Sequence, residues 1–463
     1  MDWTVAKLVE ACHGELLQGD TGDVIRRVST DTRSLEPGDC FVPLAGETHD
    51  GHDFIPDAVA KNVGAVVLSR RNIESIIPRD MALIRVADTL YALGELAGYQ
   101  RKQHTIPVIG ITGSNGKTST KEMIAAILGV EHDVHKNAGN FNNLIGVPLT
   151  LLSLEAHHQA AVIEMGINVF GEMERLVEIT NPTAGLVTNI HPAHLQGLES
   201  QERILEEKGK LLTCLAADDL AVINLDDERL RSFAKRLRAR TVTYSHADAT
   251  AQIRLAGRVE TERGVSTFPM ALGSEIVPIR LAVLGAHQVQ NALAAAALAY
   301  GLGESTENIV EGLSRHRPVH QRMEMHELRD GAVLVDDTYN ANPMSMIAAA
   351  RAVMEASRGR PVILVLGEMR EMGADGPRLH WEVGRQIGKM KATRLLTLGG
   401  LAAELNRGAI ESGMPEEACN HASDHNEIVE LLRGLKINDS WILVKGSRGM
   451  TMERVVQGLM NAD

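Results

Sequence analysis

Cysteine is scarce in this chain. The four cysteines, Cys12, Cys40, Cys214 and Cys419, are scattered through 463 residues and form no Cys-x-x-Cys pair. This spacing gives no sign of a disulfide framework, so we predict reduced thiols with a structural role.

Excess positive charge and long apolar runs are also absent. The formal net charge of -13 argues against nucleic acid or an anionic membrane surface as a general partner. No run of eighteen apolar residues occurs, and the N-terminus begins as an acid-bearing amphipathic helix rather than a basic leader. We therefore expect a cytoplasmic protein without membrane insertion, which acts on small molecules.

The length and the order of elements predict three α/β domains. A chain of 463 residues, 44% of them hydrophobic, is long enough for about three packed cores. We place the domains at residues 1–86, 87–316 and 317–463. The first is predicted to be a small α/β unit with an apolar strand at residues 64–68.

Strands and helices alternate in the second and third domains, which favours parallel sheets. After a helix at 87–103, the central strands are expected at 108–111, 161–165, 185–189 and 220–224. An antiparallel extension is expected at 251–284, followed by an alanine-rich helix at 287–300. The strands of the third domain are predicted at 332–336, 361–366, 394–398 and 441–444, with a helical stretch after each. That pattern is typical of a Rossmann-like sheet.

A glycine-rich turn between a strand and a helix is the strongest chemical signal. It reads T-G-S-N-G-K-T over residues 112–118. Its backbone N–H groups are expected to converge on phosphate oxygens at the positive end of the helix dipole, from Gly113, Ser114, Asn115 and Gly116. Lys117 would reach the outer phosphates, and the Thr118 hydroxyl would ligate magnesium. The loop predicts binding of a nucleotide triphosphate without indicating the reaction.

The glycine spacing differs from that of a standard Walker A loop. Two residues separate Gly113 from Gly116, where the standard loop has four. The alternative interpretation is a tight turn followed by a surface lysine.

Further polar groups follow the predicted central strands. Glu164 ends one strand, where a parallel sheet presents side chains to the ligand crevice. His191 and His194 follow the next strand, and either is a candidate metal ligand or base, although lone histidines are often structural. Lys208 lies in a helix that returns toward this crevice, where a lysine is either solvated or modified.

The motifs and their order resemble the Mur ligases, which extend the peptide stem of the cell-wall precursor UDP-N-acetylmuramic acid. The phosphate loop, Glu164-Met165-Gly166, residues 189–195 and the Lys208 helix follow the family's order. D-D-T-Y-N-A-N-P at 336–343, L-V-K-G-S-R at 443–448 and residues 140–152 resemble the branch that adds D-alanyl-D-alanine. The D-N-P-R tetrapeptide of the diaminopimelate-adding branch does not occur.

The resemblance implies an ATP-dependent ligase that joins D-alanyl-D-alanine to UDP-N-acetylmuramoyl-tripeptide through an acyl phosphate. Lys117 would neutralise the γ-phosphate and Thr118 would hold a first magnesium ion. Glu164 and His194 would hold a second magnesium ion, and Lys208 would be carbamoylated, which turns a cation into an anion.

The resemblance also assigns nucleotide contacts and a domain movement. Asn291 would contact adenine, and the third domain would contribute Arg322, Asp337, Tyr339 and Asn340. Closure of that domain would protect the acyl phosphate from water. We expect a monomer.

Polar turns of the first domain are implied to bind the UDP end. The residues are Ser29, Thr30, Asp31, Arg33, Thr48, Asp50, His52 and Asp53. The sequence alone would explain them equally by ordinary turn chemistry.

Some features leave alternatives open. Lys210 stands where the family often has a glutamate, which questions the hydrogen-bond support of Lys208. A folylpolyglutamate-type ligase shares the loop and the modified lysine but generally lacks a UDP-binding domain. A nucleotide-dependent switch without ligase activity would leave Glu164, His194 and Lys208 without a purpose.

Overall fold

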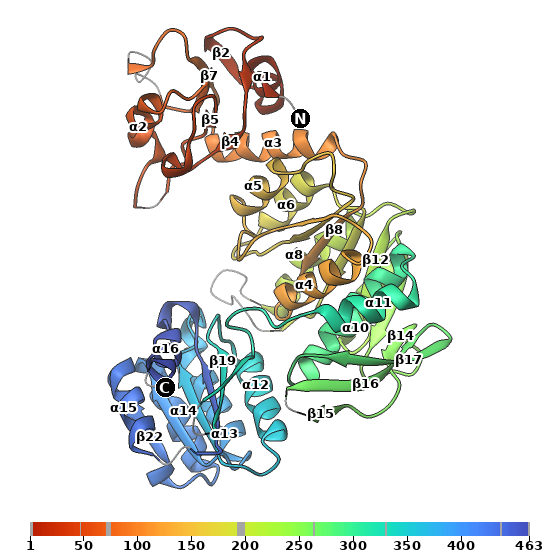
Figure 1. The fold of residues 1–463 in the computed structure, drawn as a ribbon, viewed down its shortest axis with the longest axis vertical. Coiled ribbons are helices and arrows are strands. Elements are labelled where there is room, and N and C mark those ends of the chain that lie inside the picture. Colours follow the sequence, from red (N-terminus) through yellow and green to blue (C-terminus); the bar gives the residue numbers. More distant parts are fainter. Residues whose placement is uncertain are drawn as a thin grey trace.

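Three α/β units follow one another along the chain, with the N-terminal unit at one end of the molecule (Figure 1). The structure is a computed structural model that describes residues 3–46, 48–70, 76–191, 200–262, 264–328, 331–435 and 438–461. His194 lies outside the described residues. The α/β fold class is confirmed: each of the three units is built on one larger sheet, most of whose strands are parallel.

The N-terminal unit is built on a five-stranded sheet of order β2-β7-β6-β5-β4. Its strands are β2 (Glu15–Gln18), β4 (Val28–Ser29), β5 (Cys40–Phe41), β6 (Ala65–Leu68) and β7 (Ala82–Arg85). All neighbours are parallel except β2 and β7. The predicted strand at 64–68 is thus confirmed as β6. A separate pair, β1 (Trp3–Thr4) and β3 (Val24–Ile25), and the helices α1 (Val5–Cys12) and α2 (Ile55–Ala60) complete the unit.

Helix α3 (Thr89–Lys102) connects the N-terminal unit to the central one (Figure 1). It begins at the cap Asp88, whose side chain accepts a hydrogen bond from the Tyr91 N–H at 2.8 Å. Leu93 and Leu96 pack in the N-terminal core, whereas Ala97 packs in the central core. The helix predicted at 87–103 therefore exists, and both units share it.

The central sheet has ten strands in the order β15-β16-β14-β13-β12-β11-β8-β10-β9, with β17 paired to β16. The parallel strands are β8 (Val108–Thr112), β9 (Val134–Lys136), β10 (Ala160–Glu164), β11 (Ala184–Val187), β12 (Leu220–Asn224), β13 (Arg240–Ser245) and β14 (Ile253–Leu255). The antiparallel extension comprises β15 (Glu260–Glu262), β16 (Val265–Leu272) and β17 (Glu275–Leu281). Its prediction at 251–284 is confirmed, whereas β9 and β13 were not predicted.

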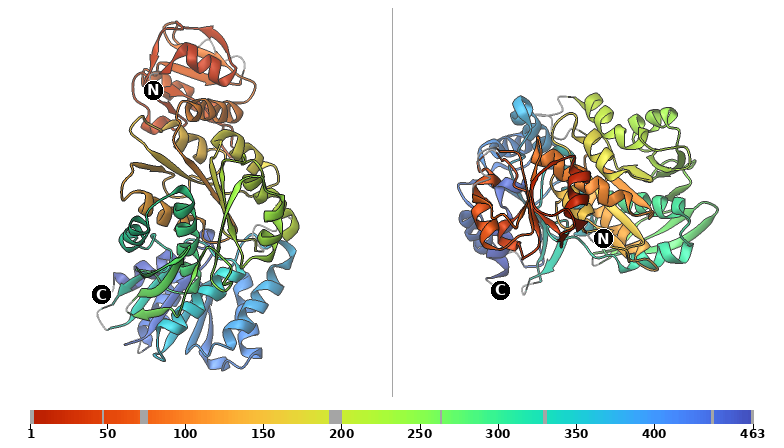
Figure 2. Two further views of the ribbon diagram at one scale, coloured as in Figure 1. Left: turned by 90° about the vertical axis from the view of Figure 1, so that its right-hand side faces the viewer. Right: turned by 90° about the horizontal axis from the view of Figure 1, so that it is seen from above.

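Helices cover both faces of this sheet, as the two further views show (Figure 2). They are α4 (Lys117–Leu128), α5 (Gly146–Leu152), α6 (Glu172–Thr180), α8 (Gln201–Thr213), α9 (Glu228–Phe233), α10 (Ala286–Leu302) and α11 (Thr306–Arg315). The alanine-rich α10 is the helix predicted at 287–300. Its residues 291–299 are all buried because their small side chains allow close packing against α4 and the sheet.

Strand order reverses beside β8. From β8 the chain adds β9 and β10 on one side, and then β11 to β13 on the other. In open parallel sheets such a reversal leaves a crevice at the carboxyl ends of the strands, where ligands bind. The phosphate loop follows β8 and therefore lies at this crevice.

The C-terminal unit has a six-stranded sheet of order β18-β19-β23-β20-β21-β22. Its strands are β18 (Glu324–Glu327), β19 (Val333–Asp337), β20 (Val362–Gly367), β21 (Arg394–Leu398), β22 (Cys419–Ala422) and β23 (Trp441–Lys445). Its helices are α12 (Pro343–Ala356), α13 (Gly376–Gly388), α14 (Ala403–Glu411), α15 (His425–Gly434) and α16 (Glu453–Met460). The four predicted strands are confirmed, while β18 and β22 were missed.

Each sheet lies within one of the three predicted domain ranges, whose exact boundaries stay a prediction. Among the described residues, no helix combines the length and the apolar character needed to cross a membrane.

Candidate active site

A cavity of about 1240 Å³ lies between the central and C-terminal units. The phosphate loop, Glu164 at the end of β10, the start of α10 and residues around Asp337 line it. The cavity therefore brings together side chains that the sequence separates by more than two hundred positions.

Two glycines shape the phosphate loop. Gly113 and Gly116 have φ angles of 144° and 82°, which side chains rarely adopt. A Cβ on Gly116 would lie 2.3 Å from Asn291 Oδ1, so the α10 amide lies directly beside the loop. Asn291, predicted as a nucleotide contact, therefore lies beside the loop, and its role stays a prediction.

The segment after β11 holds the loop in place. Asn115 donates its N–H to Asn189 Oδ1 at 2.9 Å, and its carbonyl accepts from Thr188 Oγ1 at 2.6 Å. The Ser114 hydroxyl donates to the His191 carbonyl at 2.8 Å and accepts the His191 N–H at 2.9 Å. These bonds fix the loop from the neighbouring strand, and His191 takes part through its backbone.

Lys117 and Thr118 open helix α4 at the floor of the cavity. Lys117 Nζ donates to the Gly113 carbonyl at 2.8 Å, which folds the lysine back over its own loop. Burial lowers the pKa of Lys117, Glu164 opposes this shift and Arg322 adds to it. The Thr118 hydroxyl accepts a hydrogen bond from Arg322 Nη2 at 3.0 Å.

Glu164 presents a carboxylate oxygen to the same cavity. Its Oε1 accepts a hydrogen bond from Asn142 Nδ2 at 2.8 Å. Its Oε2 is buried without a hydrogen-bond partner among the described residues. A buried, unpartnered carboxylate oxygen is costly unless a cation or a donor satisfies it. Glu164 therefore fits the role of a metal ligand.

Lys208 is almost fully buried in α8, with 1% exposure. Burial, reinforced by the charge of Lys117, lowers the pKa of Lys208 well below its ordinary value, although Glu207 opposes this shift. Lys210 forms ion pairs with Glu207 at 2.9 Å and with Glu174 at 3.2 Å. Lys210 is therefore bound to these two glutamates.

The C-terminal unit carries the other residues that are predicted to contact the nucleotide. Asp337 Oδ2 accepts from Lys445 Nζ at 2.6 Å, and the same Nζ donates to the Asn340 carbonyl at 2.8 Å. The Arg322 guanidinium lies 4.0 Å from the centre of the Tyr339 ring. All five residues line the cavity.

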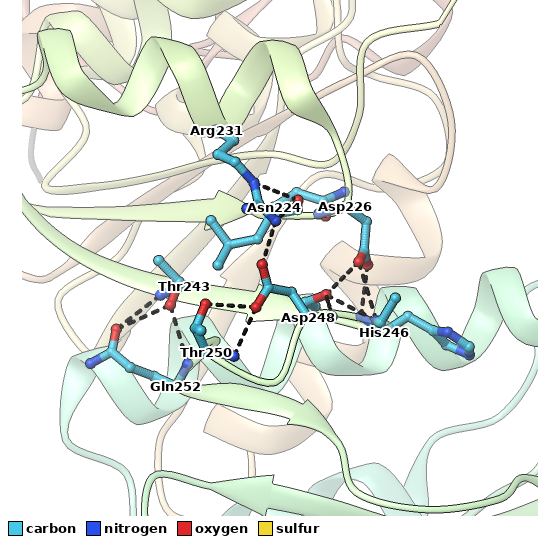
Figure 3. A network of polar contacts seen from close by, with 11 residues as sticks. Asn224, Asp226, Arg231, Thr243, His246, Asp248, Thr250 and Gln252 are labelled. Atoms are coloured by element: carbon cyan, nitrogen blue, oxygen red, sulfur yellow. Dashed lines mark hydrogen bonds and ion pairs between the residues drawn. The ribbon is translucent and has the colours of Figure 1, made fainter.

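One wall of the cavity was not predicted from the sequence. It consists of the loops after β12 and β13, which a hydrogen-bond network joins (Figure 3). Asp226 accepts the N–H groups of His246 and Ala247 at 2.6 and 3.2 Å. Asp248 accepts from Thr250 and pairs with Arg231. The sequence feature that could have predicted this wall is that both loops follow parallel strands, whose carboxyl ends lie at the edge of the crevice.

The first-domain candidates form local contacts away from this cavity. Asp31 accepts the Arg33 N–H at 2.9 Å and pairs with its guanidinium at 2.8 Å. Asp50 accepts the His52 N–H at 2.9 Å and lies 2.7 Å from His52 Nδ1. Such bonds are typical of turns and short helix caps. The whole predicted set lies outside the cavity lining: Ser29, Thr30, Asp31, Arg33, Thr48, Asp50, His52 and Asp53.

Family models match all three parts of the chain. The model of the Mur ligase family, catalytic domain, matches residues 24–101. The Mur ligase middle domain matches residues 111–299, and the Mur ligase, glutamate ligase domain, matches residues 321–448.

Relatives and solved structures match over nearly the full length. The UDP-N-acetylmuramoyl-tripeptide--D-alanyl-D-alanine ligase of Bacillus subtilis is 36% identical over 99% of this chain and 98% of its own. The ligase of the same name from Escherichia coli is 36% identical over 98% of both chains. A crystal structure of MurF from Acinetobacter baumannii matches with a TM-score of 0.91 and 30% identity, covering 100% and 99% of the two chains.

A second solved structure was determined with a nucleotide. MurF ligase from Thermotoga maritima in complex with ADP matches with a TM-score of 0.83 and 25% identity, covering 94% of this chain and 97% of that chain. On this combination of family models, relatives and site geometry, the chain belongs to the Mur ligase family.

Proposed function

We infer that the chain is an ATP-dependent ligase that adds D-alanyl-D-alanine to UDP-N-acetylmuramoyl-tripeptide in peptidoglycan precursor synthesis. Full-length relatives at 36% identity carry this activity in their names. The structural observation that carries the proposal is the cavity in which the phosphate loop, Glu164 and the Arg322 side chain meet. Because ATP and a UDP-linked substrate are required, we also propose a cytoplasmic location.

We propose that the phosphate loop binds the triphosphate of ATP. The glycine turn at the start of α4 offers backbone N–H groups and the positive end of the helix dipole. Lys117 Nζ now donates to the Gly113 carbonyl and would turn from it to a phosphate. Asn291, Arg322, Asp337, Tyr339 and Asn340 line the same cavity and are proposed as the remaining nucleotide contacts.

Magnesium fits two oxygen donors of this site. Glu164 Oε2 is buried without a partner, and Thr118 Oγ1 lies at the opening of α4. Both are oxygen ligands, which magnesium prefers. We propose Glu164, Thr118 and His194 as ligands of two magnesium ions, whose charge would neutralise the transferring phosphate. Thr118 Oγ1 accepts one hydrogen bond from Arg322 and keeps a second lone pair for that ligation.

Lys208 has the properties that carbamoylation requires. Only a neutral amine adds to carbon dioxide, and burial together with Lys117 favours the neutral form. The new N–C bond and the loss of one proton would give an anion, which the neighbouring Lys117 charge would stabilise. We propose this modification as the way in which α8 contributes a negative group to the site.

The two substrates are proposed to meet between the units. The UDP end would occupy the turns of the first domain, from Ser29 to Asp53, and the tripeptide carboxylate would extend toward Lys117. Phosphate transfer from ATP would give an acyl phosphate, and attack by the D-alanyl-D-alanine amine would release phosphate. Exclusion of water by the C-terminal unit would protect the acyl phosphate.

The test is phosphate release from ATP with UDP-N-acetylmuramoyl-tripeptide, with and without D-alanyl-D-alanine, and mass spectrometry of the product. We expect release that requires both substrates and yields the pentapeptide nucleotide. The Lys117→Ala variant should lose release while still binding the UDP substrate. ATP turnover that ignores both substrates would contradict the proposal and favour the nucleotide-dependent switch.

A further inference from the structure

A second group of ligand-forming side chains lies outside the cavity, at the edge strand β18 of the C-terminal sheet. Glu324 and Asp336 are directly opposite each other in the antiparallel pair of β18 with β19. His326 lies two residues along β18, on the same face as Glu324. One potential ligand atom from each of these three residues lies within 4.8 Å of the other two.

Each carboxylate has one oxygen held by the protein. Glu324 Oε2 accepts from His320 Nδ1 at 2.8 Å and from the Gln321 N–H at 3.1 Å. Asp336 Oδ1 accepts from the Thr338 hydroxyl at 2.6 Å and from the Thr338 N–H at 3.0 Å. Hydrogen bonds of this kind orient ligating carboxylates in metal sites.

The second oxygen of each carboxylate lacks such a partner. No described residue donates to Glu324 Oε1 or to Asp336 Oδ2, and neither nitrogen of His326 is bonded to a described residue. Asp336 is only 2% exposed, so water reaches its carboxylate poorly. Each of the three residues therefore keeps a potential ligand atom without a partner among the described residues.

The two facing carboxylates of Glu324 and Asp336 also favour a bound cation. Like charges directly opposite on paired strands are destabilising. Burial and the facing Glu324 raise the pKa of Asp336, while Thr338 and His320 oppose the shift. A bound cation would relieve the repulsion between the two carboxylates.

A comparable cluster elsewhere lacks one of these properties. Asp133, His157 and His158 also lie within ligand distance of one another. However, His158 Nδ1 accepts the Glu155 N–H at 2.9 Å. That bond places the proton of the neutral ring on Nε2, so neither nitrogen is free to bind a metal.

We propose that Glu324, His326 and Asp336 form a binding site for a divalent transition-metal ion, with Zn²⁺ as the preferred ion. One imidazole with two carboxylates suits a first-row metal better than magnesium, which prefers oxygen ligands alone. Among the common divalent ions, Zn²⁺ binds such a donor set more tightly than Mn²⁺ or Fe²⁺. Three protein ligands leave a position for water.

The location gives the ion a structural role. The chain enters the C-terminal unit through β18, directly after Arg322 and Met323. Met323 donates its N–H to Asp337 Oδ1 at 3.2 Å, at the rim of the nucleotide cavity. A metal ion that joins β18 to β19 would fix the position of β18. Arg322, which lies just before this strand, would thereby be held at the cavity.

The test is Zn²⁺ binding by the full chain, stripped with a chelator and measured by calorimetry without nucleotide and with excess Mg²⁺. We compare the wild type with His326→Ala and Glu324→Gln, and use His157→Ala as the matched control. We expect one equivalent of tightly bound Zn²⁺ whose affinity falls about tenfold or more in the first two variants and is unchanged in the control. Zn²⁺ should also raise the melting temperature of the wild type but not of His326→Ala.

Two results would overturn the proposal. One is equal Zn²⁺ affinity and stoichiometry in the wild type, His326→Ala and Glu324→Gln. The other is loss of the tight equivalent in His157→Ala, which would place the ion at the other cluster. Melting curves in chelator establish that each variant is folded, and both substituted side chains are partly exposed, so folding should persist.

Discussion

Arg322 Nη2 donates a hydrogen bond to the Thr118 hydroxyl at 3.0 Å, across the boundary between the C-terminal and central units. A second bond crosses the same boundary, from Asn342 Nδ2 to Asn115 Oδ1 at 2.6 Å. Both contacts end on the phosphate loop or the first turn of α4. The conformation therefore has its C-terminal unit held against the nucleotide site by two polar contacts.

Arg322→Ala should weaken ATP binding about tenfold, because we propose that the guanidinium contacts the nucleotide, and a hydrogen bond to a charged group contributes roughly 1.5–3 kcal/mol. The measurement is the KM for ATP in the ligation assay, together with the radius of gyration in solution without nucleotide. We expect a larger radius in the variant. Arg322→Lys is the control that keeps the charge without the planar fork; an unchanged KM in Arg322→Ala would contradict the role.

Asn342 has two functions that two substitutions separate. Its Oδ1 accepts the Ser345 N–H at 2.9 Å and caps α12, whereas its Nδ2 contacts Asn115. Asn342→Asp keeps the cap acceptor and loses the amide donor, so it should lower ligation at unchanged melting temperature. Asn342→Ala should lose both and destabilise the protein by about 1 kcal/mol. Identical melting temperatures of the two variants would show that the cap contributes nothing.

Lys208→Ala should lose most ligation activity, because the proposed carbamate disappears with the amine. Short carboxylates such as formate or acetate should restore part of the activity by occupying the space of the missing anion. The same additives should not help Lys117→Ala, whose lost group is a cation. Failure of rescue over a wide range of carboxylate concentration would argue against carbamoylation.

Gly116→Ala should impair nucleotide binding strongly, because its φ of 82° and the 2.3 Å approach to Asn291 both oppose a Cβ. Gly359→Ala is the matched control, since its φ of 86° is similar but nothing lies within 4 Å of the added Cβ. Both variants should lose about 1 kcal/mol of stability from backbone strain. Only Gly116→Ala should lose binding of a fluorescent ATP analogue; equal binding by both variants would refute the steric argument.

The free energy of unfolding should decrease at acidic pH, in part because of His316. Burial lowers the pKa of His316 from 6.5 to about 4. The unfolded chain therefore takes up a proton below pH 6.5 that the folded chain accepts only near pH 4, so stability is lost as the pH falls through this window. The loss is about 3 kcal/mol at most.

His316→Leu removes this proton uptake. The melting temperature of the variant, measured relative to that of the wild type, should therefore increase as the pH is lowered from 7 to 4.5. The exposed His49, substituted by glutamine, is the control and should leave the pH dependence as it is. A parallel decline of the wild type and His316→Leu would show that His316 does not drive the acid sensitivity.

The sequence predicted the parts of the site that depend on local pattern. Strand periodicity was enough to predict the β-branched run of β8 before its glycines. The polar residue at the end of β10 was predicted because parallel strands present such residues at their carboxyl ends. Strand β22 was missed because C-N-H-A is short and largely polar. The contacts of Arg322 and Asn342 with the loop join residues 204 and 227 positions apart, which no local pattern encodes.

The first domain illustrates the opposite case. Its polar turns were linked to UDP only through the family resemblance, and Asp31 and Asp50 are occupied by their own neighbours. Ligand contacts of such residues depend on a substrate that competes with short-range hydrogen bonds. Neither the sequence nor the local geometry shows the outcome of that competition.

Helix α3 has a consequence for how the chain unfolds. Leu93 and Leu96 on one face belong to the N-terminal core, and Ala97 belongs to the central core. Loss of the N-terminal unit would leave an apolar stripe of this helix in water, so a chain shortened to the central and C-terminal units would tend to self-associate. Melting of the first unit would likewise weaken the second. The two units therefore form one cooperative block, whereas the C-terminal unit has a core of its own, which Leu284 of the central unit joins.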